Sequence, residues 1–225
     1  MKQIYSALIL LLLCPFGVLE AQHSKHLEIL QTSDTHSRIE PVPVNSSDRN
    51  AGMGGVVRRA AFIKEARLQN PDVLLFDCGD ISQGTPYYNF FKGEVEIKTM
   101  NLMGYDAMAI GNHEFDFGLD NMARLFRMAK FPVLCANYDV KGTVLEGLVK
   151  PYVILHRDGL KIGVFALAPK LEGLVQADKC EGVVYNDPVP IAQNIADLLK
   201  EKEHCDIVIC LSHLGLKSHY PGTPC

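Results

Sequence analysis

The sequence lacks the features that mark several common classes of protein. It has no excess of positive charge, since 22 Lys and Arg residues stand against 26 Asp and Glu residues, and this balance argues against a nucleic-acid partner. It has no internal repeat with a period of about 20–50 residues, which excludes a solenoid. No C-x-x-C pair occurs, so a zinc ribbon and a thioredoxin-type site are excluded. A Walker A loop, a G-x-G-x-x-G turn and a G-x-S-x-G elbow are also absent.

The composition is that of an ordinary globular domain. The 225 residues are 48% hydrophobic and 21% charged, with a formal net charge of −4, which is enough to bury a core and too apolar for disorder. Seven cysteines are too few for a disulfide scaffold. Three of them lie in apolar runs that predict buried strands, namely Cys78, Cys135 and Cys210. The other three outside the leader lie in polar surroundings, where a disulfide could form after export: Cys180, Cys205 and Cys225.

The N-terminus has the pattern of a secretory signal. Lys2 precedes an apolar core at residues 4–13, and the small residue Ala21 offers a cleavage position. A membrane-spanning helix needs about 20 apolar residues, and this core is shorter. We therefore expect residues 1–21 to be a cleaved signal peptide and the protein to be exported to the periplasm or the extracellular space, with no stable membrane span after cleavage. An uncleaved N-terminal anchor is the alternative.

Short apolar runs alternate with helical patterns along the rest of the chain. The runs predict strands at residues 27–30, 73–76, 107–110, 132–136 and 206–211. Helices are predicted at residues 56–68, 119–130 and 187–203. An Asp-Gly pair at 158–159, between apolar runs at 152–156 and 160–167, predicts a hairpin. This alternation predicts an α/β fold with mixed sheets covered on both faces.

Polar side chains follow four of the predicted strands. These segments are Asp34-Thr35-His36, Gly79-Asp80, Gly111-Asn112-His113-Glu114 and Ser212-His213. In open α/β sheets, ligands gather at the carboxyl ends of the strands. Each segment alone is more typical of a turn or a surface histidine. Together they predict a metal site, because carboxylate, imidazole and amide groups suit divalent metals and a carboxylate can bridge two ions.

As a set, these segments resemble the motifs of the calcineurin-like metallophosphoesterases. The matching residues are Asp34-x-His36, Gly79-Asp80-x-x-Gln83-Gly84, Gly111-Asn112-His113-Glu114-x-Asp116 and Ser212-His213-x-Gly215. Residues 32–38 and Ala136-Asn137 make the chain similar to the exported 5′-nucleotidase branch, over residues 27–216. The resemblance implies a two-sheet sandwich flanked by helices and a small nucleotide substrate.

The resemblance also implies a cofactor of two divalent metal ions, of the Zn, Mn or Fe type. Asp34 and His36 would hold the first metal, Asp80 would bridge the two ions, and Asn112 and His213 would hold the second. Because Asn112 is a neutral ligand, it would leave more positive charge for a phosphate group.

Two further residues have implied catalytic roles. His113 would act on the phosphate or on the leaving oxygen, and Asp116 would orient it and raise its pKa. Glu114 is expected to anchor the neighbouring backbone and not to touch a metal.

The motif set is incomplete, which leaves alternatives open. Residues 22–225 would form a metallophosphoesterase domain without the Gly-His-x-His segment and the nucleoside-binding C-terminal domain of the family, and His219 is expected at the surface. Hydrolysis of nucleoside 5′-monophosphates is the leading prediction. The alternatives are a 2′,3′-cyclic phosphodiesterase or UDP-sugar hydrolase, a catalytically incompetent fragment, and a subunit of a split nucleotidase whose partner chain carries the nucleoside-binding domain.

Overall fold

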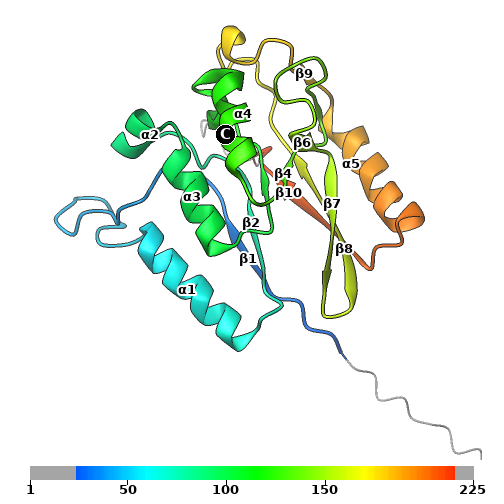
Figure 1. The fold of residues 1–225 in the computed structure, drawn as a ribbon, viewed down its shortest axis with the longest axis horizontal. Coiled ribbons are helices and arrows are strands. Elements are labelled where there is room, and N and C mark those ends of the chain that lie inside the picture. Colours follow the sequence, from blue (N-terminus) through cyan, green and yellow to red (C-terminus); the bar gives the residue numbers. More distant parts are fainter. Residues whose placement is uncertain (1–23, 216–225) are drawn as a thin grey trace, which may run out of the picture.

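Two β-sheets packed face to face, with helices on both outer sides, organise the chain (Figure 1). The structure, a computed structural model, describes residues 24–215. The expected signal peptide, His219 and Cys225 lie outside the described residues. The α/β sandwich flanked by helices agrees with the fold class predicted from the sequence.

The first sheet has five parallel strands in the order β1-β2-β3-β4-β6. These strands are β1 (Ile29–Thr32), β2 (Leu74–Asp77), β3 (Ala107–Ala109), β4 (Val133–Leu134) and β6 (Val149–Lys150). Because neighbouring strands are parallel, their carboxyl ends lie at one edge of the sheet. The loops after β1, β2 and β3 are thereby brought together.

Helices cover the outer face of the first sheet, where their apolar sides form one core with it. They are α1 (Val56–Gln69), α2 (Pro86–Phe91), α3 (Glu94–Met103) and α4 (Gly118–Met128). Ile63 of α1, Ile97 of α3 and Met122 of α4 are each at most 3% exposed in this core. Leu75 and Met108 face them from the sheet.

The second sheet has three strands in the order β10-β8-β7, of which β7 (Tyr152–Arg157) and β8 (Leu160–Leu167) form the predicted hairpin. Asp158 and Gly159 both have positive φ, 45° and 65°, as a type I′ turn requires. The parallel strand β10 (Ile207–Ser212) follows α5 (Pro188–Asp197) and a π-helical turn at Leu198–Lys202.

The two sheets meet through an apolar interface. Leu74, Phe76 and Ala107 of the first sheet are buried against Ile162 and Val164 of the second. Successive side chains of a strand point to opposite faces, so Phe165 and Leu167 of β8 face the other way and pack with Leu199. This packing fixes the end of β10 next to the ends of β1, β2 and β3.

Most of the predicted elements are confirmed within a few residues, and the exceptions are short or local. The helices α2 and α3, at residues 86–103, were not predicted from the sequence. The pairing of β5 (Tyr138–Asp139) with β9 (Val184–Tyr185) was not predicted either. Cys78 and Cys135 are buried as predicted, but the prediction for Cys210 is wrong. Cys210 is exposed because it lies on strand β10 at the edge of its sheet, on the face opposite Leu211. Within residues 24–215, Cys180 and Cys205 form no disulfide, and Cys205 is buried.

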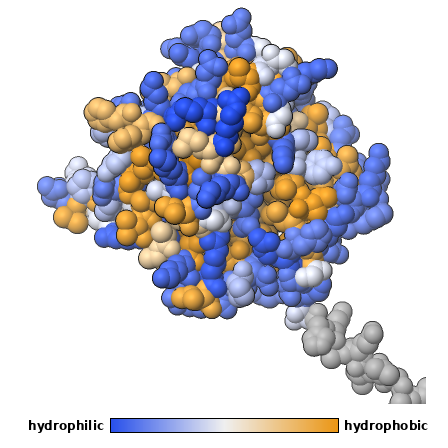
Figure 2. All heavy atoms as spheres, viewed as in Figure 1, coloured by the Kyte–Doolittle hydropathy of each residue, from blue (hydrophilic) through white to orange (hydrophobic). Residues whose placement is uncertain are grey.

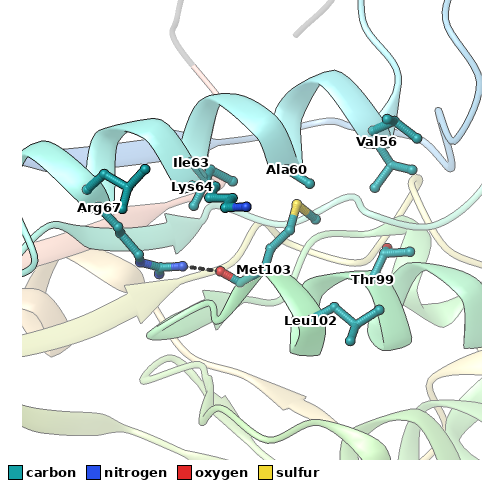
Figure 3. Close-up of a pocket in the computed structure, with 10 residues that line it drawn as sticks. Val56, Ala60, Ile63, Lys64, Arg67, Thr99, Leu102 and Met103 are labelled. Atoms are coloured by element: carbon teal, nitrogen blue, oxygen red, sulfur yellow. Dashed lines mark hydrogen bonds between the residues drawn. The ribbon is translucent and has the colours of Figure 1, made fainter.

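An open groove of about 590 Å³ runs between α1 and α3 (Figure 3). Arg67 closes one end by donating hydrogen bonds to the carbonyl oxygens of Met103 and Gly104. Figure 2 shows apolar and polar side chains mixed on this face of the molecule, and Leu102 beside the groove is 87% exposed. Among residues 24–215, no helix is both long and apolar enough to span a bilayer.

Asp77, at the end of β2, is a buried carboxyl group 1% exposed to solvent. Burial raises its pKa from 3.8 to about 7, although hydrogen bonds from Thr32 Oγ1 (2.6 Å) and the Gly79 N–H (2.8 Å) favour its ionised form. The folded chain therefore keeps a proton that the unfolded chain releases between about pH 4 and pH 7. In this window the free energy of unfolding should fall as pH rises.

We expect Asp77→Asn to remove this pH dependence. An amide preserves both contacts, since its oxygen accepts from Gly79 and its NH₂ group donates to Thr32 Oγ1. Each pKa unit corresponds to about 1.4 kcal/mol. Between pH 4 and pH 7.5, the free energy of unfolding of the variant should therefore rise by a few kcal/mol relative to that of the wild type. Urea unfolding with a chelator present measures this gain. Asp158→Asn in the exposed hairpin turn is the control, and a constant difference between Asp77→Asn and wild type would refute the prediction.

Candidate metal centre

The loops that follow β1, β2, β3 and β10, with the segment after β8, line an open cavity of about 700 Å³. This volume lies within the range of small-molecule sites. Its walls include five of the residues that the sequence predicted for the site: Asp34, Asp80, Asn112, His113 and His213. Asp34 also borders a second cavity of about 450 Å³, whose wall includes His36.

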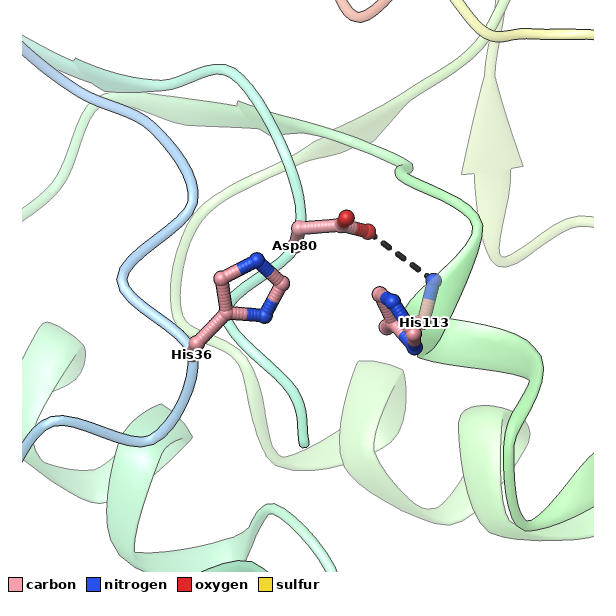
Figure 4. Close-up of side chains that lie close together, drawn as sticks. All are labelled: His36, Asp80 and His113. Atoms are coloured by element: carbon pink, nitrogen blue, oxygen red, sulfur yellow. Dashed lines mark hydrogen bonds between the residues drawn. The ribbon is translucent and has the colours of Figure 1, made fainter. Parts of the chain in front are cut away.

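Two groups of possible metal ligands share the carboxylate of Asp80. One consists of Asp34, Asp80 and His213, the other of His36, Asp80 and His113, and in each group the ligand atoms lie within 4.8 Å of one another. Figure 4 shows His36, Asp80 and His113 pointing toward one another from three loops. Asp80 is 4% exposed, and its Oδ1 accepts a hydrogen bond of 2.9 Å from the His113 N–H.

Each of the three imidazoles is held by its Nδ1 atom. His213 Nδ1 lies 2.7 Å from the Cys78 carbonyl oxygen, and His36 Nδ1 lies 3.1 Å from that of Ser82. Because a carbonyl oxygen can only accept, both Nδ1 atoms carry the proton and Nε2 is left for another ligand. This second contact is typical of metal-binding histidines. His113 Nδ1 lies 3.1 Å from Asp116 Oδ2.

His213 and Asp80 form an ion pair inside the cavity. His213 Nε2 lies 3.2 Å from Asp80 Oδ2, and both side chains are at most 10% exposed. Burial alone would lower the pKa of His213, but the hydrogen bond and charge of Asp80 raise it to about 9. Burial alone would raise the pKa of Asp80, but hydrogen bonds from His213 and the His113 N–H lower it. The site therefore favours positive charge next to the Asp80 carboxylate.

The buried carboxylate of Glu114 ties two of the loops together. Its Oε2 accepts from the N–H groups of Asp80 (3.0 Å) and Gly111 (2.6 Å), and its Oε1 accepts from Ile81 (3.0 Å) and Ser82 (3.3 Å). Burial and the charge of Asp80 raise the pKa of Glu114, whereas these N–H groups lower it. The anchoring role expected from the sequence is thus a specific contact with four backbone groups.

Close approach of the backbone makes this arrangement dependent on glycine. A Cβ atom at Gly111 would lie 2.1 Å from Asp80 Oδ1, and one at Gly79 would lie 2.7 Å from the Gly111 nitrogen. Asp34, His36 and Asp80 themselves have positive φ, between 43° and 56°. Such conformations cost about 1–3 kcal/mol each and cluster at functional sites. Local strain therefore accompanies three of the predicted ligands.

The structure gathers all the predicted site residues in one region but groups them differently. Asp34 shares a candidate ligand group with Asp80 and His213, and His36 shares one with Asp80 and His113, although His36 Nε2 also lies 3.8 Å from Asp34 Oδ1. Asn112 lines the cavity, and His113 belongs to a candidate ligand group as well as to the pair with Asp116. The assignment of individual ligands stays a prediction. The carbonyls of Cys78 and Ser82 were missed because backbone acceptors have no side-chain signal.

Sequence comparison identifies the family of the chain. Residues 27–225 match the model of the calcineurin-like phosphoesterase family. The chain belongs to this family. Divalent metal ions are the cofactors that membership implies, and the carboxylate and imidazole groups around Asp80 are the ligand types that such ions prefer.

Relatives and solved structures agree with this family. The chain is 39% identical over 202 residues to a snake venom 5′-nucleotidase of Crotalus adamanteus and 36% identical over 198 residues to the 5′-nucleotidase of Homo sapiens, covering 87% and 85% of this chain and 34% of each relative. A 5′-nucleotidase precursor from Thermus thermophilus superposes with a TM-score of 0.74 at 33% identity, over 84% of this chain and 37% of the other. The chain thus spans about a third of the length of the curated relatives it matches.

We expect Glu114→Gln to destabilise the site strongly, although it removes no atom of the cavity wall. The NH₂ group of glutamine would face two backbone N–H donors, and each unsatisfied buried donor costs about 1–3 kcal/mol. The expected loss in unfolding free energy is about 2–6 kcal/mol, measured by urea unfolding. Glu201→Gln, at an exposed position in the turn Leu198–Lys202, makes the same chemical change and should have little effect. Equal stability of the two variants would contradict the anchoring role.

Proposed function

We propose that this chain carries the dinuclear metal centre of an exported phosphoesterase that hydrolyses nucleoside 5′-monophosphates. The observation that carries the proposal is the position of Asp80, which offers a carboxylate oxygen within 4.8 Å of ligand atoms of Asp34 and His213 in one group and of His36 in the other. A carboxylate has two oxygens and can serve two ions at once. A buried Asp80 at the meeting point of four loops supports a bridging role.

The metals proposed for the site would be of the Zn, Mn or Fe type. Carboxylate and imidazole ligands suit these ions, and each histidine already has its second nitrogen held by a carbonyl or carboxylate. When bound, two such ions neutralise the charge of a phosphate ester and promote ionisation of the attacking water. Asp34, His36, Asp80, Asn112 and His213 are the proposed ligands.

His113 is the proposed acid of the reaction. Its Nδ1 is engaged by Asp116 at 3.1 Å, and the residue lines the cavity, so Nε2 remains free to face a phosphate group. In its protonated form the ring would donate to a phosphoryl oxygen or give its proton to the leaving alkoxide. Asp116 holds the ring in place and stabilises its positive charge.

Similarity to named proteins supports the substrate and the place of action. The relatives are named 5′-nucleotidases, and three of them are snake venom proteins. A solved structure with a TM-score of 0.72 and 31% identity is the NAD nucleotidase of Haemophilus influenzae. Together with the leader-like residues 1–21, these names favour a nucleotide substrate and a site outside the cytoplasm.

His113→Ala tests the function and the role of this residue together. With Mn²⁺, Zn²⁺ or Co²⁺ added, we expect wild type to release phosphate from AMP and the variant to be slower by about 10²–10⁴-fold. Metal content and melting temperature should barely change, because His113 is partly exposed in an open cavity. His156→Ala, which removes an exposed histidine of β7, is the matched control and should leave turnover unchanged.

Other outcomes would point to other functions. Loss of metal in His113→Ala would make this residue a ligand and contradict the acid role. Release from a 2′,3′-cyclic nucleotide or a UDP-sugar, but not from AMP, would contradict the proposed substrate. A wild type that binds metal and releases no phosphate from any of them would favour the non-catalytic alternative or a separate chain that binds the nucleoside.

A further inference from the structure

The loop that carries Asp34 and His36 is held in an unusual backbone conformation. Asp34, His36 and Ser37 have φ values of 52°, 43° and 53°. The loop runs beside residues 79–81, since the N–H groups of these three residues donate to Gly79, Asp80 and Ile81 at 3.0, 3.1 and 2.8 Å. Positive φ is unfavourable for residues other than glycine, so contacts outside the loop must stabilise it.

Ser37 supplies such contacts on the buried side of the loop. It is 1% exposed, and its hydroxyl donates a hydrogen bond to Glu96 Oε1. The hydroxyl of Thr85 lies 2.8 Å from the Ser37 carbonyl oxygen and 2.9 Å from Ser37 Oγ. The residue directly after His36 is thus hydrogen-bonded to two residues outside the loop, Thr85 before α2 and Glu96 in α3.

Glu96 is a costly residue to bury. It is 4% exposed, and its Oε2 has no hydrogen-bond partner among the described residues. The same small cavity is lined by Glu96 and Arg59, whose Nε also lacks a partner there. Its place in the first turn of α3 favours a carboxylate, but a buried charge is normally destabilising unless it is fully paired. Packing alone therefore does not explain a carboxylate at this position.

We propose that Glu96 is a positioning residue for the metal centre, acting through Ser37 on the backbone of His36 and Asp34. The effect on metal affinity rests on the proposed function. The effect of Glu96 on the conformation of the loop does not require a metal. Glu96 is 59 residues from Ser37 in the sequence. It would couple the start of α3 to the orientation of two proposed ligands.

Hydrogen exchange of the metal-free full chain tests the hold on the loop. In the presence of a chelator, Glu96→Met should speed exchange of the Asp34, His36 and Ser37 amides by at least about tenfold, because methionine fills the space without an acceptor. Glu96→Gln keeps an acceptor for Ser37 and should restore protection. Ser37→Ala should reproduce the effect of Glu96→Met. Met100→Leu, a change of similar volume at another residue of the same cavity wall, is the control.

Titration with Zn²⁺ or Mn²⁺ then tests the effect on the site. Glu96→Met should weaken binding by about 10–100-fold, as loss of an indirect partner typically does, and Glu96→Gln should stay near wild type. Unchanged loop exchange in both Glu96→Met and Ser37→Ala would overturn the proposal, whatever the metals do. Faster exchange with unchanged affinity would overturn the positioning role. If wild type binds no metal, the proposed function fails, and the exchange result alone decides whether Glu96 holds the loop.

Discussion

The Glu114 carboxylate, with its four backbone N–H donors, is the contact on which the rest of the site depends. It joins the segment after β2 to the turn after β3. The Asp80 carboxylate can then receive the His113 N–H on one side and face His213 on the other. A buried carboxylate is tolerated here because each of its two oxygens accepts two backbone hydrogen bonds. These bonds offset the loss of hydration and connect the two segments rigidly. The left-handed conformation of Asp80 is maintained by this connection.

The sandwich supplies the second constraint. His213 comes from β10 of the second sheet, whereas Asp34, Asp80 and His113 come from loops of the first. Their meeting depends on how the inner faces pack, through small and branched side chains such as Ala107, Val164 and Ala166. The apolar interface therefore sets the distance between His213 and Asp80, and the ring's bond to the Cys78 carbonyl sets its orientation.

Much of this could be read from the sequence, because burial and periodicity act locally. Strand ends and the residues that follow them were predictable from apolar runs, and the Asp158-Gly159 turn from its need for positive φ. The helix α3 was missed although Ile97 and Met100 show helical spacing, and α2 has only six residues. Partners such as the Ser82 carbonyl, and the Ser37–Glu96 contact between distant segments, have no local signal. Which ligands pair likewise depends on the packing of the two sheets.

The central claim is that Asp80 serves two metal ions, and equilibrium dialysis against Zn²⁺ or Mn²⁺ with Asp80→Asn and Asp34→Asn tests it most directly. Asparagine at position 80 keeps an acceptor for the His113 N–H, so the loop should survive while the bridging charge is lost. The account predicts that Asp80→Asn abolishes metal retention at both positions, whereas Asp34→Asn removes only part of it, because Asp34 belongs to one of the two groups. Equal residual metal in the two variants, with both folded, would contradict a shared carboxylate.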